Sequence, residues 1–336
     1  MRFFGCIIVL NMRERIGEMS NTQQNNEQHI TSIGGQAVIE GVMMRGPKEI
    51  ATAVRKSDGS IIIDKMPVSS IVSKYKLKKI PIVRGVVAFV ESLVTGMKCL
   101  MFSADQMDIE DEEGYQPSKF ETWLDDKFGD KIKDIAIYFS VVVAILFSIG
   151  LFMLLPNALA TVVGFFTKNH IILNLAEGVI RMSIFLCYLI LVSKMKEIQR
   201  VFEYHGAEHK TIATYESGAE LTVENARKHS RLHPRCGTSF LLIVMVVSII
   251  IFSFLRWGSM WQNMLYRLLL MPVVAGISYE MIKIAGKSKN KCVAILTKPG
   301  LWLQMVTTRE PDDSQLEVAI ASLKAVLTDN KEDDKW

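Results

Sequence analysis

Two histidines lie four residues apart in the sequence HGAEH, at His205 and His209, with Glu208 directly before the second. On a helix this spacing places two nitrogen ligands one turn apart, as zinc sites on helices require. The order H-x-x-E-H is that of the inverted zincins, metallopeptidases in which the glutamate is the general base. The motif therefore predicts a metal site at His205 and His209, with Glu208 as the catalytic base.

Two further metal-binding residue types follow in RLHPRCGTSF, residues 231–240, as His233 and Cys236. Imidazole and thiolate groups both suit zinc, and a reducing compartment keeps the thiol free to act as a ligand. Four protein ligands would close the site and make it structural, whereas three would leave a position for water and make it catalytic. The spacing leaves both ligand sets open.

Each motif also has a plainer interpretation. His233 and Cys236 can belong to a turn that leads into a helix, and His205 and His209 can be buried histidines satisfied by hydrogen bonds. Cys236 can instead be a nucleophile at a helix N-terminus, with His233 as its base. We prefer the metal hypothesis because both motifs occur close together in a chain with only six histidines.

Residues 195–217 are expected to form one helix that ends before a glycine. At about 100° per residue, His205 and His209 share its apolar face with Glu216, and Glu208 lies at the edge of that face. The opposite, polar face carries Glu203, Lys210 and Thr214. A buried imidazole needs a partner for its nitrogens, and a metal ion is one such partner.

Four apolar segments are candidates to cross a bilayer, because each approaches the roughly 20 residues that a spanning helix needs. They are residues 135–155, 171–192, 239–255 and 264–284. The loop 193–238 holds eight Lys and Arg residues, whereas loops 156–170 and 256–263 hold one each. Basic residues mark cytoplasmic loops, so both termini and the His/Cys loop are expected to face the cytoplasm.

The chain is therefore predicted to be an α-helical integral membrane protein with about four transmembrane helices and a small cytoplasmic N-terminal region that contains a β-hairpin. The hairpin prediction rests on Asp58 and Gly59, which lie between two β-rich runs. Glu40 and Arg45, in the same region, are candidates to bind a substrate or cover the site. The predicted segments are 1–32, a disordered leader or a start codon placed too early; 33–102, β structure plus a helix; 103–134, an acidic linker; 135–192, the first transmembrane pair; 193–238, the His/Cys loop; 239–284, the second transmembrane pair; and 285–336, a C-terminal cytoplasmic segment.

Two apolar stretches are not counted as membrane spans. Residues 82–102 are expected to form a helix with its charged residues in one stripe, which suits a membrane-surface helix or a core helix with one polar edge. Near the C-terminus, Pro299 and Gly300 indicate a short pair of strands.

Charged residues also occur inside the apolar segments. Glu177 and Arg181 are four residues apart and are expected to pair along one helix. Glu280, near the cytoplasmic end of the last segment, is a candidate for a further ligand or a proton acceptor, although its side chain can equally extend to the interface. With Arg267, these residues allow a transporter hypothesis, in which they line one polar path.

The composition excludes several functional classes. The hydrophobic fraction is 49% and the net charge is only +4, with no basic stripe interleaved with aromatic residues, so nucleic-acid binding is not expected. The five cysteines are scattered, which argues against a disulfide scaffold. The expected partners are the lipid bilayer and either a second copy of the chain or another membrane protein.

Long stretches of the sequence resemble the YqhQ-like family of bacterial membrane proteins, across nearly all of residues 33–328. These stretches are GGQAVIEGVMMRGP, PIVRGVVAFVESLVTGMKCL, FEYHGAEHKTIATYESGAELTVENARKHSRLHPRCGTSFL, PVVAGISYE and PGLWLQMVTTREPDDSQLEVAI. The resemblance implies a metal-dependent enzyme in the bacterial inner membrane and names no substrate. The residues that match the family's polar signature are Glu40, Arg45, Glu203, His205, Glu208, His209, His233, Arg235 and Cys236.

The leading hypothesis is a zinc-dependent hydrolase with a cytoplasmic-face site, acting on a peptide or a lipid-linked substrate. In it, His205 and His209 bind the metal, Cys236 or His233 completes the ligand set, and Glu208 activates water. The alternative is a membrane scaffold or assembly protein in which the two histidines, His233 and Cys236 close a structural site.

Both hypotheses require distant residues to meet. On a straight helix His205 would lie roughly 20 Å beyond Val192, so the chain must bend between them. Imidazoles of His205 and His209 more than about 8 Å from both His233 and Cys236 would exclude the composite site, since ligands lie near 2 Å from zinc.

Overall fold

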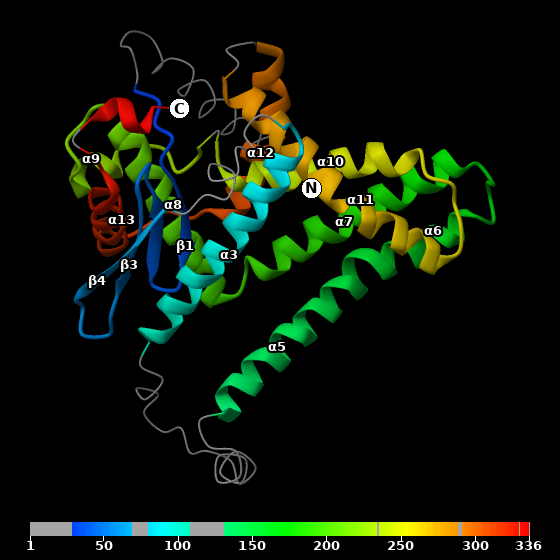
Figure 1. Ribbon diagram of the computed structural model, residues 1–336, viewed down its shortest axis with the longest axis horizontal. Helices are drawn as coiled ribbons and strands as arrows, with labels where there is room; N and C mark the ends of the chain where they lie inside the picture. The colour runs from blue at the N-terminus through cyan, green and yellow to red at the C-terminus, as the bar shows by residue number, and fades with distance from the viewer. Residues whose placement is uncertain are drawn as a thin grey trace, which may run out of the picture.

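The computed structural model describes residues 29–68, 80–107, 131–233, 235–287, 291–328 and 330–335. A four-stranded sheet and the helices packed on it form a body at one end, and long apolar helices extend from this body (Figure 1). The described chain is mostly helical with a small antiparallel sheet near its N-terminus, in agreement with the prediction. Most of the predicted leader and linker, residues 1–28 and 108–130, lies outside the described residues.

The sheet is an antiparallel meander in which each strand pairs with the next one along the chain. Its strands are β1 (Gly34–Val38), β2 (Gly41–Arg45), β3 (Glu49–Arg55) and β4 (Ile61–Pro67). The predicted hairpin at Asp58 and Gly59 is the β3–β4 turn, where Gly59 has a φ of 84° that favours glycine. The β1–β2 hairpin is missing from the prediction, because its turn residues Ile39 and Glu40 are not typical turn formers.

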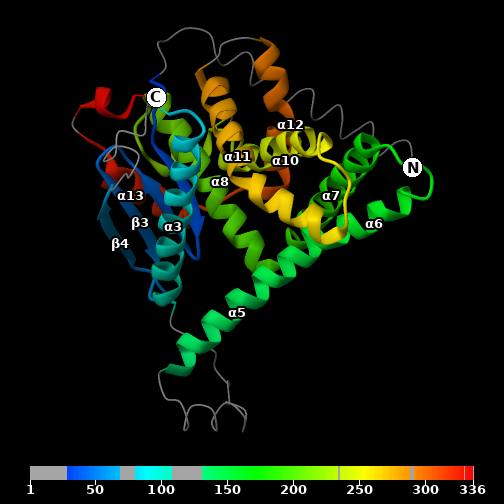
Figure 2. The same ribbon diagram turned by 45° about the vertical axis from the view of Figure 1, so that its right-hand side comes forward.

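Helices cover both faces of the sheet (Figures 1 and 2). These helices are α3 (Val83–Asp105), α8 (Lys196–Glu216) and α13 (Asp313–Val326). Val42 and Met44 point to the face on which α8 and α13 pack, and they share a buried core with Tyr204 of α8. Met43 points to the other face, where it packs with Cys99 of α3. The alternation of side chains along β2 thus places two separate cores on the two sides of one sheet.

The helix predicted over residues 195–217 is α8, and it does not continue the helix before it. α7 ends at Val192, and Met195 has an extended backbone at the N-cap of α8, with φ −71° and ψ 135°. The chain therefore bends between Val192 and His205, as the composite site requires.

The polar face predicted for α8 is not a solvent-exposed face at Lys210 and Thr214, which are both buried. The short helix α9 (Val223–Arg227) packs on this side. Lys210 Nζ donates to Arg227 O at 3.0 Å and pairs with Glu310. Since the sheet, α13 and α9 surround α8, Lys210 and Thr214 form their hydrogen bonds inside the protein instead of with water.

The remaining elements are α5 (Lys131–Ile149), which continues through the π-helical turn η3 (Gly150–Leu154) into α6 (Leu155–Val163), then α7 (His170–Val192), α10 (Gly237–Ser253), α11 (Met260–Lys287), α12 (Lys291–Thr307) and the 3-10 helix η4 (Lys331–Asp334). Among the described residues, four helices are long and apolar enough to cross a membrane, namely Val83–Asp105, Phe139–Val163, His170–Val192 and Met260–Ile284. The number agrees with the prediction, but the set differs. The predicted span at 239–255 is α10, which at 17 residues is shorter than these four helices. Helix α3, which was not predicted to span, is one of the four.

The strand pair predicted around Pro299 and Gly300 is also wrong, because both residues lie inside α12. Helix α12 packs against α10, and a Cβ at Gly300 would lie 2.4 Å from Ser239 Oγ. The glycine therefore serves a close approach of two helices, and the packing outweighs the local turn signal.

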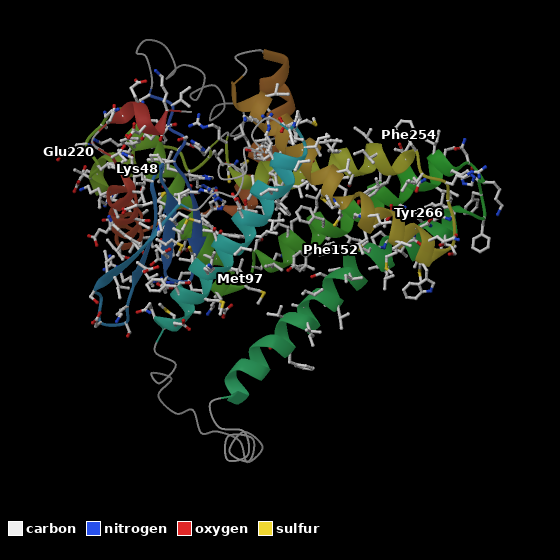
Figure 3. All side chains as sticks on the ribbon, in the orientation of Figure 1. Lys48, Met97, Phe152, Glu220, Phe254 and Tyr266 are labelled. Carbon is white, nitrogen blue, oxygen red and sulfur yellow. The ribbon has the colours of Figure 1, made fainter. Side chains whose placement is uncertain are left out.

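Charged residues on α7 and α11 pair with one another. Glu177 binds Arg181, as predicted, and Arg267 Nη1 donates to the same carboxylate at 2.8 Å. Arg181 Nε donates at 3.0 Å to the carbonyl of Phe152, a residue labelled in Figure 3. In a regular helix this carbonyl would accept from residue 156, but Pro156 has no N–H. The arginine thus satisfies the backbone group that the proline leaves free.

The segment that joins α12 to α13 crosses α8 at Gly206. Arg309 N donates to Phe202 O at 2.8 Å, and a Cβ at position 206 would lie 2.0 Å from Arg309 O. Glycine at this position allows the two backbones to touch, and the adjacent His205 is held at the same crossing.

We expect the substitution Gly206→Ala to lower the free energy of unfolding by about 1–3 kcal/mol, because the new methyl group overpacks this crossing. Gly150→Ala is the matched control, since Gly150 is also helical and nothing lies within 4 Å of its Cβ position. Thermal unfolding of both variants in one detergent measures the difference. Equal melting temperatures would contradict the close approach.

Candidate metal centre

The fold brings His205, His209 and Cys236 together. Both histidines lie on α8, and Cys236 is the N-cap residue of α10. One ligand atom of each residue lies within 4.8 Å of the other two, and His205 Nε2 is 3.2 Å from Cys236 Sγ. Among the described residues, this is the group of His, Cys, Asp or Glu side chains whose geometry can hold a metal ion. We call these three residues the donor group.

Backbone carbonyls fix both imidazole rings of the donor group. His205 Nδ1 lies 2.9 Å from Thr307 O, at the end of α12, and His209 Nδ1 lies 2.6 Å from Arg231 O. A carbonyl only accepts hydrogen bonds, so each Nδ1 carries a proton, and in the neutral ring each Nε2 then keeps a lone pair. Histidines that bind zinc are commonly held in this way, with the second ring nitrogen donating to a carbonyl or carboxylate.

The Nε2 atom of His209 is buried without a hydrogen-bond partner, in a residue that is 1% exposed. Its neighbour Glu208 Oε2 lies 3.5 Å away and is also 3.9 Å from His205 Nε2. Lone pairs that face a carboxylate in a buried place need a proton or a metal ion between them. Two imidazole nitrogens and a thiolate are donors that zinc accepts, so the residues present fit a zinc ion.

Strand β1 holds Glu208 beside the donor group. Gly35 N donates to Glu208 Oε1 at 3.0 Å, and the glutamate is buried. A Cβ at position 35 would lie 2.7 Å from Glu208 Cγ, so the approach of strand and helix requires glycine there. Because Oε1 is held by the strand and Oε2 faces the two histidines, the carboxylate is placed to accept a proton next to them.

His233 does not join the donor group. Its Nε2 lies 3.6 Å from Glu216 Oε2 and 3.3 Å from Arg235 Nη2. Burial disfavours the charged form of Glu216, but its hydrogen bond to His233 and the charge of Arg235 outweigh burial, so the pKa of this carboxyl lies below its usual value. Glu216 therefore remains ionised, and its carboxylate holds the side chain of His233. The nucleophile hypothesis also changes, because the thiol of Cys236 lies 3.2 Å from His205 Nε2, whereas Cys236 meets His233 through its backbone N–H, which donates to His233 O at 3.3 Å.

Two further candidates, Glu203 and Glu40, hold elements of the fold together. Glu203 accepts from Gln315 Nε2 of α13 at 3.0 Å. Glu40, in the β1–β2 turn, binds Arg200 and accepts from Tyr204 Oη at 3.2 Å. Burial raises the pKa of Tyr204, and the negative charge of Glu40 raises it further. Both glutamates thus attach α8 to its neighbours and lie outside the donor group.

The last two candidates, Glu280 and Arg45, also lie outside the donor group. Glu280 accepts from Arg84 Nε at 2.6 Å, so it connects α11 to α3 instead of supplying a ligand. Arg45 ends β2 and is paired with Ile50 of β3.

Sequence reasoning missed the residues that hold the donor group from α12. Gln304, which is fully buried, accepts from His233 N at 2.9 Å and donates to His233 O at 2.8 Å. Thr308 binds Arg231, whose carbonyl orients His209. A helical assignment of α12 would have placed Gly300, Gln304 and Thr308 in one stripe, at intervals of four residues. That stripe is the signal that could have found them.

A cavity of about 90 Å³ opens beside the donor group. Its lining includes Glu208, His209 and Cys236 on one side and residues 32–35 on the other. The volume corresponds to about three water molecules. Water can therefore reach the donor group from this side.

A sequence model of the family described as "Protein of unknown function (DUF1385)" matches residues 80–329. The chain belongs to this family. A relative from Bacillus subtilis (strain 168), described as "Uncharacterized protein YqhQ", is 38% identical over 303 residues, which cover 88% of this chain and 92% of the relative. No solved structure matches the chain.

Membership of the family confirms the resemblance carried by the sequence motifs. The matched region contains the donor group, Glu208 and His233, whereas the β-sheet precedes it. Neither description names a metal or a reaction, so the chemistry of the site has to be argued from its geometry.

We expect zinc to copurify with the protein and to depend on the donor group. His209→Ala and Cys236→Ser each withdraw one ligand and should abolish zinc retention through dialysis, whereas His233→Ala, the matched control, should retain it. Elemental analysis by mass spectrometry measures the zinc content of each folded variant. If His233→Ala loses zinc as fully as His209→Ala does, His233 is a fourth ligand and the three-residue set is wrong.

Proposed function

We propose that the protein is a zinc-dependent hydrolase of the bacterial inner membrane, with its site on the cytoplasmic face. The observation that carries the proposal is the buried, unpartnered Nε2 of His209, which points into a group completed by His205 and Cys236. The substrate is a peptide or a lipid-linked molecule that reaches the site near the membrane surface.

The number of donors supports an enzyme over a structural site. Structural zinc sites have four protein ligands, whereas catalytic sites have three and an exchangeable position. His233, which a closed site would need, is engaged by Glu216 and Arg235. A scaffold with a structural metal would also have no use for the carboxylate of Glu208 or for the cavity beside it.

His205, His209 and Cys236 would hold the zinc ion, which would supply Lewis-acid chemistry for hydrolysis. Glu208 Oε2 takes a proton from the attacking water and returns it to the leaving group, while the N–H of Gly35 holds Oε1 in place. The carbonyls of Thr307 and Arg231 keep the two rings in one tautomer through the reaction. Burial of these groups behind β1 limits the access of bulk water.

The membrane placement rests on the basic residues of loop 193–238 and on the separation between the sheet body and the far end of the apolar helices. Lys48 and Glu220 lie in the sheet body, and Phe254 and Tyr266 lie at the far end of the apolar helices (Figure 3). We take α5–α6, α7, α10 and α11 as the four crossings. The basic loop 193–238 then remains with the sheet body in the cytoplasm.

Helix α3 is apolar and long, but its contacts argue against a crossing. Its C-terminal half packs on the sheet through Cys99, and Ser103 Oγ accepts from Ile39 N at 3.3 Å. Its N-terminal half lies against Tyr279, near the end of α11 that leads back to the body. With both ends on one side, α3 is placed along the membrane surface, with its exposed Leu93 and Met97 toward lipid.

We expect a cysteine introduced at Ser259 to react with a membrane-impermeant maleimide in intact spheroplasts, and a cysteine at Glu220 to react only after permeabilisation. The reason is that Ser259 lies in the loop between α10 and α11, whereas Glu220 lies between α8 and α9. The unsubstituted protein serves as the blank. Labelling of both positions from the same side would contradict the topology.

Glu208→Gln should retain zinc and lose hydrolysis by about 10²–10⁴-fold, because the amide cannot accept the proton of water. Glu203→Gln is the matched control on the same helix, since its carboxylate binds Gln315 instead. Zinc content is measured beside hydrolysis of labelled casein peptides and of vesicles made from bacterial lipid extract. Loss of zinc from Glu208→Gln would make the glutamate a ligand, and equal activity of the two variants would contradict its role as base.

A further inference from the structure

Two glycines in the lining of the cavity have no structural need to be glycine. Gly34 of β1 and Gly237 of α10 both line the cavity and are exposed, and nothing lies within 4 Å of either Cβ position. Neither has a positive φ, which among the described glycines occurs at Gly59 and Gly218. The fold therefore tolerates a side chain at both positions, yet the cavity is bordered by bare backbone. Such positions are where a ligand's own backbone can approach closely.

The outer edge of β1 offers hydrogen-bonding groups beside these glycines. β1 is the first strand of the sheet order, so one of its edges has no neighbouring strand among the described residues. Val38 pairs with Gly41 across the two-residue turn, and hydrogen-bonded pairs alternate along an antiparallel ladder. Gly35 and Ala37 therefore direct their backbone groups away from β2, and the bond from Gly35 N to Glu208 confirms this direction.

The small volume of the cavity favours an extended substrate that passes across it over a small molecule that would be enclosed in it. Pockets that enclose small molecules have volumes of roughly 300–1,000 Å³. The cavity here has about 90 Å³ and is bordered by residues 32–35 of the strand and its approach. An extended peptide needs only a free strand edge, with backbone bonds for affinity and a gap for the bond that is cut.

We propose that the substrate is an extended peptide that pairs with the outer edge of β1, passing Gly34 and Gly237, so that the hydrolase is a peptidase. The inference rests on the proposed function, and it selects the peptide over the lipid-linked substrate. The carbonyl of Gly35 and the backbone groups of Ala37 hold the peptide in register, while the N–H of Gly35 keeps Glu208 next to that edge, where it can activate water. In the cleavage step, water adds its oxygen to the peptide carbonyl carbon, the C–N bond breaks, and the two protons of water end on the new carboxyl and amine sides.

The test uses the full-length, zinc-loaded Glu208→Gln protein in detergent, so that a bound peptide is not cut. Short unstructured peptides that carry a photo-reactive benzoylphenylalanine are cross-linked to it, and the adducts are mapped by mass spectrometry. We expect adducts on residues 34–37 and 235–238. Adding Gly34→Val, whose side chain occupies the open space, should reduce these adducts about tenfold. Gly150→Val is the matched control, because its Cβ position is equally open and lies far along the chain in η3.

The outcomes separate this inference from the proposed function. Zinc content is measured in every variant, and its absence from the unsubstituted protein would overturn the proposed function. If zinc is bound but adducts fall outside β1, or Gly34→Val and Gly150→Val cross-link equally, the peptide inference is wrong. The same holds if the lipid vesicles are hydrolysed in a Glu208-dependent way while peptides are neither bound nor cut, and the zinc hydrolase then stands with a different substrate.

Discussion

The segment 304–311 determines the geometry of the site, because it contacts the two parts of the chain that supply the donor group. Gln304 binds the backbone of His233 on both its N–H and its carbonyl, and so fixes the loop that ends in Cys236. Thr307 O orients the ring of His205 on α8. The histidines and the cysteine come from different helices, so their mutual distances depend on this segment remaining in place. Most of these contacts use backbone atoms, which the folded chain positions more rigidly than flexible side chains.

The helical period of the sequence predicted which residues of α8 share a face with the histidines. It did not predict which other elements pack against the remaining faces of α8. The period of α8 placed His205 and His209 on one buried face, and that face does meet Cys236. The helical wheel places Lys210 and Thr214 on the opposite, polar face, but it does not show that this face is buried as well. Helix α8 instead has neighbours on several sides, and no local pattern reveals that α9 folds back over it.

The C-terminal part shows why local turn signals are weaker than packing. Pro299 and Gly300 form a typical turn pair, yet they lie within α12, where the glycine permits contact with Ser239 of α10. Because this segment was predicted to form strands, the prediction did not identify Gln304, which reaches the loop of His233 only from a helix. The contacts that correct these errors are long-range and have no signature in a single sequence.

The position of His233 shows how one cluster of charges contacts both the loop beside the donor group and the segment that leads into β1. Glu216 contacts His233, whose ring lies 5.5 Å from the ring of His209, and Arg235 completes this cluster by binding the same carboxylate. Glu216 also accepts from Thr31 N at 2.9 Å, in the segment that leads into β1. That strand in turn holds Glu208 through Gly35. A single carboxylate therefore contacts both His233 and the segment that leads into the strand that holds Glu208. The charge that Glu216 retains, against the cost of its burial, is what maintains both arrangements at once.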